Sequence, residues 1–263
     1  MKNSKGMQLG ALLAAMLLVG MAFVPVVGAQ KDAKMKKDIH NAEEMDRLVQ
    51  EIAKYKEQGK NISSLLDEYN VTQETYTEKV FKLQRSADGY LEPAESDVPT
   101  QGGNVTIQAG SYSDLTVYIH QYSVGSGWAT VDADWKWNSV ENWGNRGTDD
   151  VVDLDWYPYD YVLSSRCMSG GYWGGLQMGV VQAYTPDATT SGWMVIGLLR
   201  KSPDKIGNWT QVNMNYHHTY APVFQSMNLG LNAGNQNTQG SVSITVSPGG
   251  EWPKGASAPF LIQ

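Results

Sequence analysis

Residues 128–161 decide the fold, and they read WATVDADWKWNSVENWGNRGTDDVVDLDWYPYDY. Apolar and acidic residues alternate over residues 128–137 and again over residues 150–157, which is the period of two that strands with one buried face show. Asn, Gly and Asp crowd the residues between them, a composition typical of a loop. The stretch therefore predicts two β-strands joined by a long loop.

Successive side chains of a strand point to opposite faces of its sheet. Each of the two strands thus has a core row and an outer row, and each outer row carries two carboxylates about 7 Å apart by the two-residue rise. We expect Trp135, Trp137, Leu154 and Trp156 in the core rows, and Asp132, Asp134, Asp153 and Asp155 in the outer rows. If the two strands are neighbours, the four carboxylates could converge.

The region from residue 104 to residue 263 reads as one Trp-rich β domain. All nine Trp residues lie in it, and short alternating segments are separated by Gly, Asn, Asp and Pro. Further strands are expected at residues 104–108, 115–124, 175–185, 192–201, 209–220 and 241–246. With no helical run between them, these strands predict an antiparallel β-sandwich or jelly roll. The two least polar segments, 175–185 and 192–201, are expected to form a central hairpin.

The composition differs over residues 30–86, which are rich in charged residues and contain no Trp. Apolar residues recur three or four apart over residues 39–53, which predicts a helix. Further helices are expected at residues 63–69 and at residues 73–83, the last with Thr72 as its N-cap. This short helical segment of two to three helices offers an amphipathic face to a protein partner. The acidic, Pro- and Gly-containing residues 87–103 read as a linker.

Residues 1–29 have the pattern of a secretory signal peptide: Lys2 and Lys5, an apolar run over residues 9–27, then Gly28 and Ala29. We expect a secreted or cell-surface protein with no membrane span after cleavage, and a retained anchor is the alternative. Cys167 is the only cysteine, so no intramolecular disulfide can form, and we interpret it as a buried small side chain.

Composition and motifs limit the classes of function that the sequence supports. Hydrophobic residues at 41% and charged residues at 18% are typical of a folded protein, and a net charge of −7 disfavours nucleic acid as a partner. The G-x-S-x-G, H-E-x-x-H and P-loop motifs are missing from the sequence, so no catalytic residue is assigned. Four N-x-[ST] sequons predict a glycoprotein, with acceptors at Asn61, Asn70, Asn104 and Asn208.

Two kinds of ligand suit the loops and strands around residues 128–173. Aromatic rings beside polar residues can stack on sugars, and the expected contacts are Trp143, Asn145, Trp156, Tyr157, Tyr159 and Trp173. Calcium takes six to eight oxygen ligands, and the expected ligands are Asp149, Asp150, Asp153 and Asp155. A plain solvated acidic face is the alternative to a calcium site.

These observations favour an exported, non-enzymatic protein that binds carbohydrate or another envelope component through aromatic and acidic loops. One alternative is a structural component of a surface layer, with the helices mediating assembly. A second alternative is a polysaccharide-acting enzyme with Asp153 or Asp155 as its acid or base, since glycoside hydrolysis needs paired carboxylates.

Overall fold

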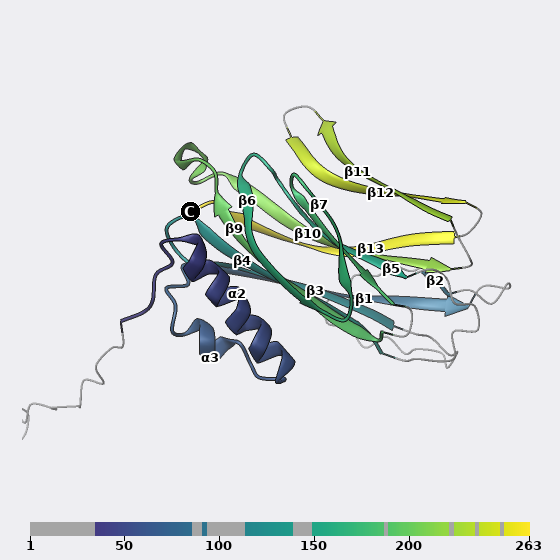
Figure 1. The fold of residues 1–263 in the computed structure, drawn as a ribbon, viewed down its shortest axis with the longest axis horizontal. Helices are drawn as coiled ribbons and strands as arrows, with labels where there is room; N and C mark the ends of the chain where they lie inside the picture. Colours follow the sequence, from purple (N-terminus) through teal and green to yellow (C-terminus); the bar gives the residue numbers. More distant parts are fainter. Residues whose placement is uncertain are drawn as a thin grey trace, which may run out of the picture. The chain divides into compact units, whose positions relative to one another are not determined.

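The computed structural model describes residues 35–85, 91–93, 114–138, 149–186, 189–220, 224–234, 237–247 and 250–263, with side chains in these ranges except for 84–93 and 220–252. Two antiparallel sheets pack face to face (Figure 1). This confirms the predicted antiparallel β-sandwich with a short helical segment before it. Expected strand 104–108 and most of the expected linker 87–103 lie outside the described residues.

The six-stranded sheet has the order β2-β1-β3-β4-β9-β6. Its strands are β1 (Gln73–Arg85), β2 (Leu91–Pro93), β3 (Asp114–Ser123), β4 (Trp128–Trp137), β6 (Tyr161–Ser169) and β9 (Ser191–Arg200). The five-stranded sheet has the order β13-β10-β5-β8-β7. Its strands are β5 (Asp150–Trp156), β7 (Tyr172–Gln177), β8 (Val180–Thr185), β10 (Trp209–Tyr220) and β13 (Gly250–Leu261). A separate hairpin is formed by β11 (Phe224–Gly234) and β12 (Asn237–Ser247).

The main core lies between the two sheets and follows strand parity. Trp135, Trp137, Leu154 and Trp156 are all buried in it, as predicted. Trp135 packs against Gly192, where a Cβ atom would lie only 2.2 Å from the indole ring. Glycine at this position therefore lets the indole ring of Trp135 approach the backbone of β9.

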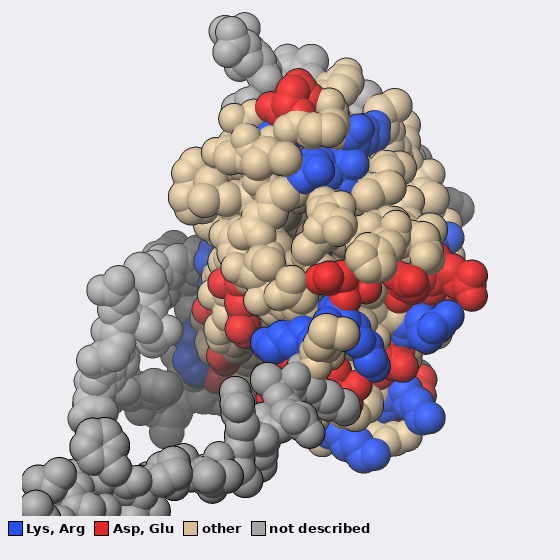
Figure 2. All heavy atoms as spheres, turned by 90° about the vertical axis from the view of Figure 1, so that its left-hand side faces the viewer, with Lys and Arg blue, Asp and Glu red and all other residues tan. Residues whose placement is uncertain are grey.

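The helix α2 (Ala42–Glu57) covers the outer face of the six-stranded sheet. Asn41 caps it, because its Oδ1 accepts from the backbone N of Glu44 at 3.0 Å. Its apolar stripe, including Met45, Leu48 and Ile52, forms a second core with Trp128 and Trp193 of the sheet. Figure 2 shows acidic and basic side chains gathered over the part of the molecule where α2 and α3 (Ser63–Leu66) lie.

The predicted third helix is wrong, because residues 73–83 belong to β1. This strand pairs with β3 along its length, from Gln73 opposite Ser123 to Lys82 opposite Asp114. The segment is rich in Thr, Tyr, Val and Phe, which fit a pleated surface, and pairing with a neighbouring strand outweighed the helix-like spacing. The second helix is also shorter than residues 63–69, and Leu91–Pro93 of the expected linker form β2.

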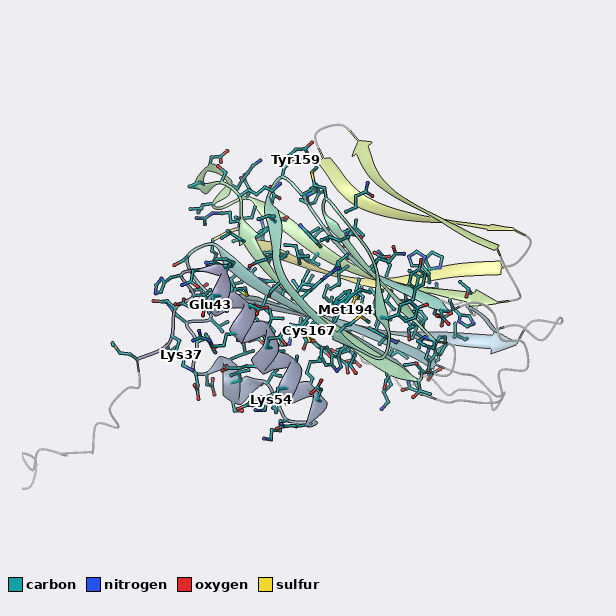
Figure 3. The ribbon with its side chains drawn as sticks, viewed as in Figure 1. Lys37, Glu43, Lys54, Tyr159, Cys167 and Met194 are labelled. Carbon is teal, nitrogen blue, oxygen red and sulfur yellow. The ribbon has the colours of Figure 1, made fainter. Side chains whose placement is uncertain are left out.

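The predicted central hairpin is wrong as well, because β8 and β9 lie in different sheets. β8 instead forms a hairpin with β7 through a turn at Met178 and Gly179, where Gly179 has φ +82°. β9 is apolar for another reason: Met194 and Ile196 face the main core, while Trp193 and Val195 face α2 (Figure 3 labels Met194). The low polarity of β9 therefore results from the burial of both its faces. It does not indicate which strand is its neighbour.

Candidate functional site

The outer face of the five-stranded sheet, directed away from the main core, carries a polar cluster. We call it the polar sheet face, and it consists of Gln182, Asp153, Asp155, Asn213, Asn215 and His217. Three neighbouring strands supply it: β8 provides Gln182, β5 the two aspartates, and β10 the other three residues. The register places Gln182 opposite Asp153 and Asp153 opposite Asn215, so that these side chains form one row across the sheet.

Hydrogen bonds join the two aspartates to β10. The amide of Asn215 donates to Asp153 Oδ1 at 2.9 Å and to Asp155 Oδ2 at 3.1 Å, and thereby bridges them. Asn213 donates to Asp155 Oδ1 at 2.7 Å, and His217 Nε2 lies 2.9 Å from Asp153 Oδ2. Asp153 is fully buried, and a buried carboxylate needs such donors to offset its desolvation.

Gln182 is the exception in this cluster. It is fully buried, yet neither its amide nitrogen nor its amide oxygen has a hydrogen-bond partner within the described part of the chain. Leaving a buried polar group unpaired costs about 1–3 kcal/mol, so such groups are rare. A donor and an acceptor thus lie beside Asp153 without a partner among the described residues, an arrangement that suits a polar ligand.

Trp209 lies at one end of the polar sheet face. It begins β10 and, by strand parity, it points to the same side as Asn213, at about 14 Å along the strand. With 69% of its surface exposed it is among the most exposed large apolar residues of the described chain. Sequence reasoning missed it, although the polar residues at alternate positions 211, 213, 215 and 217 mark that face as an outer one.

The β11–β12 hairpin lies along the polar sheet face, since β12 packs against β5 and β8. Its register pairs apolar residues with apolar ones, as Met227 with Ile244, and polar residues with polar ones, as Asn228 with Ser243. A two-stranded hairpin is marginally stable by itself, so this one depends on what it packs against.

The four predicted calcium ligands do not come together. Asp153 and Asp155 lie on the polar sheet face, whereas Asp150 points to the core side and accepts from Thr219 N at 2.9 Å and from His218 Nδ1 at 3.0 Å. Asp149 accepts from the hydroxyl of Tyr172 at 2.6 Å, which raises the pKa of that tyrosine to about 12. Within the described residues, no group of three or more His, Cys, Asp or Glu side chains is arranged to hold a metal ion.

The condition for convergence of the two acidic rows is not met, since the two strands are not neighbours. Because β4 and β5 lie in opposite sheets, the outer rows face away from each other across the sandwich. Asp132 and Asp134 are covered by α2, and Lys56 Nζ lies 2.5 Å and 2.6 Å from their carboxylates. Burial, and then the neighbouring Asp132, raise the pKa of Asp134 to about 7, although Lys56 opposes the shift.

The predicted aromatic contacts are dispersed. Trp156 is buried, and its Nε1 donates to the carbonyl of Tyr161 at 3.1 Å. Trp173 is half-buried under the guanidinium of Arg166, 4.5 Å from the ring centre. Both rings are therefore part of the packing. Tyr159 is exposed and Tyr157 half-buried, while the expected contacts Trp143 and Asn145 lie outside the described residues.

The remaining predicted positions are mostly at the surface. The sequon residues Asn61, Asn70 and Asn208 are exposed, Asn104 lies outside the described residues, and glycosylation stays a prediction. Cys167 is free and half-buried beside α2, and burial raises the pKa of its thiol (Figure 3). No helix in the described ranges is both long and apolar enough to cross a membrane.

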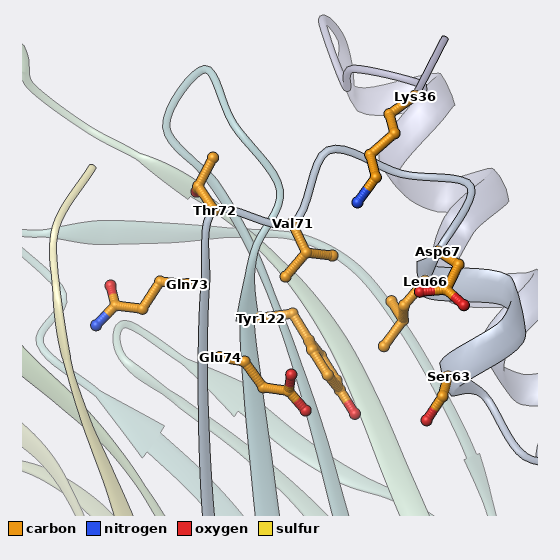
Figure 4. A pocket seen from close by; sticks show the side chains of 9 residues that line it. All are labelled: Lys36, Ser63, Leu66, Asp67, Val71, Thr72, Gln73, Glu74 and Tyr122. Atoms are coloured by element: carbon orange, nitrogen blue, oxygen red, sulfur yellow. The ribbon is translucent and has the colours of Figure 1, made fainter. Parts of the chain in front are cut away.

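Apart from the polar sheet face, a polar hollow of about 330 Å³ lies between α3 and the start of β1 (Figure 4). Lys36, Asp67, Glu74 and Tyr122 contribute polar atoms to its lining. Glu74 already pairs with the ring of His120 at 2.5 Å, and burial lowers the pKa of this histidine against the opposing effect of Glu74. The hollow lacks a buried, unpaired group comparable to Gln182 among the described side chains that line it.

Comparison with known proteins adds no family: the chain matches no protein-family model, and no curated protein is significantly similar to it. The chemistry of the polar sheet face must therefore carry the functional argument.

Proposed function

We propose that this protein is a non-catalytic binding protein that recognises carbohydrate along the polar sheet face. The observation that carries the proposal is Gln182, a buried side chain whose amide donor and acceptor have no partner among the described residues. A sugar hydroxyl is both a donor and an acceptor, so one hydroxyl or a vicinal pair can satisfy such an amide.

The neighbouring residues suit the same ligand. Carboxylates such as Asp155 accept hydrogen bonds from hydroxyl groups. The half-buried amides of Asn213 and Asn215 can donate hydrogen bonds to sugar hydroxyls and accept hydrogen bonds from them. The exposed ring of Trp209 offers a flat apolar surface for the C–H face of a sugar. A saccharide chain would lie on Trp209 and Asn213 and reach Gln182, which is fully buried, where β12 packs against β5 and β8.

Binding is favoured over hydrolysis by the placement of the carboxylates. Glycosidases place two carboxyl groups on either side of the scissile bond. Asp153 and Asp155 instead point to the same side of one strand, and each already accepts hydrogen bonds from β10. Calcium has no place in the proposal, because Asp150 lies on the opposite side of β5 from this pair. The predicted signal peptide would bring the protein to extracellular or envelope polysaccharide.

The test is a glycan array followed by calorimetric titration of the best ligand with the purified protein. We expect Trp209→Ala to weaken binding about tenfold, the loss expected for one stacked ring. Tyr159→Ala is the matched control, because Tyr159 is similarly exposed but lies outside the polar sheet face. Its affinity should equal that of the wild type.

Gln182→Met separates a ligand-binding role from a structural one. Methionine has nearly the same shape, so replacing an unpaired amide should leave the melting temperature unchanged or raise it, while binding is lost. A structural amide would give the opposite result, a lower melting temperature with unchanged affinity. The proposal fails if the wild type binds no glycan, or if Gln182→Met binds as tightly as the wild type.

A further inference from the structure

The main core is open along one edge of the sandwich. β6 and β7 are the edge strands of their sheets, and a short turn at Gly170 and Gly171 connects them. Near this turn Arg166 of β6 stacks on Trp173 of β7 and closes the gap between the two strands. Farther along the same edge the gap between β6 and β7 is open.

Beyond the Arg166–Trp173 pair lies a groove of about 260 Å³, which we call the edge groove. Core residues form its floor: Trp156, Tyr161 and Leu163. Its rim consists of Val162, Leu176 and Met178, which are 43%, 54% and 53% exposed. Large apolar side chains that line a groove and remain half exposed indicate a binding surface.

Glycines place β7 and its turn close to neighbouring groups. A bulge interrupts the pairing of β7 with β8 between Trp173 and Leu176. A Cβ atom on Gly174 would lie 2.6 Å from the ring of Tyr184, and one on Gly179 would lie 2.7 Å from the carbonyl of Trp156. Glycine at these two positions therefore lets β7 and its turn lie close to Tyr184 of β8 and to the end of β5.

One cation stands at the groove. Lys201 lines it, and its backbone N donates to the carbonyl of Asp160 at 2.8 Å, which fixes the position of the residue. The carboxylate of Asp160 lies 3.9 Å from the ammonium of Lys205 instead. Among the described residues, no carboxylate forms a salt bridge with Lys201, so its charge is available to an outside anion.

From this arrangement we propose that the edge groove binds a single-chain anionic amphiphile, with the alkyl chain against Leu163 and Leu176 and the anionic head on Lys201. The apolar lining provides for the chain and the lysine complements the head. A whole anionic bilayer is a poorer occupant, because the protein carries a net charge of −7. The inference does not depend on the carbohydrate proposal, which concerns another face.

The test compares three probes of equal chain length below their micellar concentrations: dodecanoate, dodecanol and dodecyltrimethylammonium. Binding is followed by displacement of the anionic dye anilinonaphthalene sulfonate and by calorimetry. We expect dodecanoate to bind most tightly and the cationic probe most weakly. Lys201→Gln should weaken dodecanoate about fivefold, the upper range for an exposed ion pair, and leave dodecanol unchanged.

Leu176→Gln should weaken both dodecanoate and dodecanol about tenfold, because it removes apolar area from the rim. Lys79→Gln and Ile206→Gln are matched controls, exposed side chains outside the groove lining, and should bind like the wild type. All four positions are exposed, so the variants should fold.

Three outcomes would overturn the inference. Dodecanoate affinity unchanged in Lys201→Gln would remove the head-group contact. A loss with Ile206→Gln equal to that with Leu176→Gln would indicate general surface adsorption. Cosedimentation with phosphatidylglycerol vesicles, without binding of monomeric dodecanoate, would assign the surface to a membrane.

Discussion

Lys56 allows a quantitative test of how α2 is attached to the sheet. Its ammonium lies 2.5 Å and 2.6 Å from the carboxylates of Asp132 and Asp134, and the three side chains are nearly buried. Replacing Lys56 by Met leaves two carboxyl groups without their cation. Breaking a buried ion pair by removing one partner costs about 3–5 kcal/mol, because the remaining charge is uncompensated.

The cost of Lys56→Met should depend on pH. At pH 5 Asp134, with its pKa raised to about 7, is already protonated in the folded wild type. Lys56→Met then leaves one uncompensated carboxylate at pH 5 but two at pH 8. We therefore expect a loss of about 3–5 kcal/mol at pH 8 and a clearly smaller loss at pH 5.

The assay is urea unfolding at both pH values, followed by tryptophan fluorescence. Lys54→Met is the matched control: it removes a lysine from the same last turn of α2, but an exposed one, and should cost under about 0.5 kcal/mol (Figure 3). Replacing Lys56 by Met and both aspartates by Asn together should recover most of the loss. A loss that is below about 1 kcal/mol, or equal at pH 5 and pH 8, would refute the reasoning.

Three further predictions follow from burial and packing. The folded state holds a proton on Asp134 that the unfolded chain releases, so stability should fall as pH rises from about 4 to 7, and Asp134→Asn should flatten this slope in urea titrations. Gly192→Ala should cost about 1–3 kcal/mol in the same assay, because its Cβ would press on Trp135, while Gly197→Ala meets a flexible methionine and should cost less. Leu48→Ala should lower the unfolding free energy by about 2–5 kcal/mol, and a smaller loss would show that α2 is loosely packed.

Strand parity predicted much of the fold. The limits of β4 and β10 follow directly from alternation, and the pairs Asp132/Asp134 and Asp153/Asp155 do point away from the main core. The adjacent residues His217 and His218 bond different aspartates on opposite sides of β10, as neighbours on a strand must. These features depend only on local geometry, which the sequence carries.

Other strands gave no local signal. β13 contains Pro253 and Pro259, which argue against a strand, but an edge strand tolerates proline because one side of its backbone needs no donors. β6 shows no clean alternation, since a bulge shifts its register between Leu163 and Ser165. The sequence alone also could not assign each strand to one of the two sheets, because pairing between distant segments decides it.

The candidate site, too, could be predicted only in part from the sequence. Parity could assign Asp153 and Asp155 to an outer face, but not the arrival of Asn213 and Asn215 beside them from a strand some sixty residues later. The unpaired state of Gln182 depends on every neighbour in three dimensions. A search for polar residues at alternate positions in all strands would have highlighted β10 and its Trp209.

The order of strands also governs when the protein can fold. β4 lies between β3 and β9, with Trp128 opposite Leu199, and β5 lies between β8 and β10, with Trp156 opposite Val212. Neither sheet can be completed by a contiguous piece of chain, and folding driven by such distant pairings takes milliseconds to seconds. For the export that the sequence predicts, such a delay would let the unfolded polypeptide cross a membrane before its sheets close.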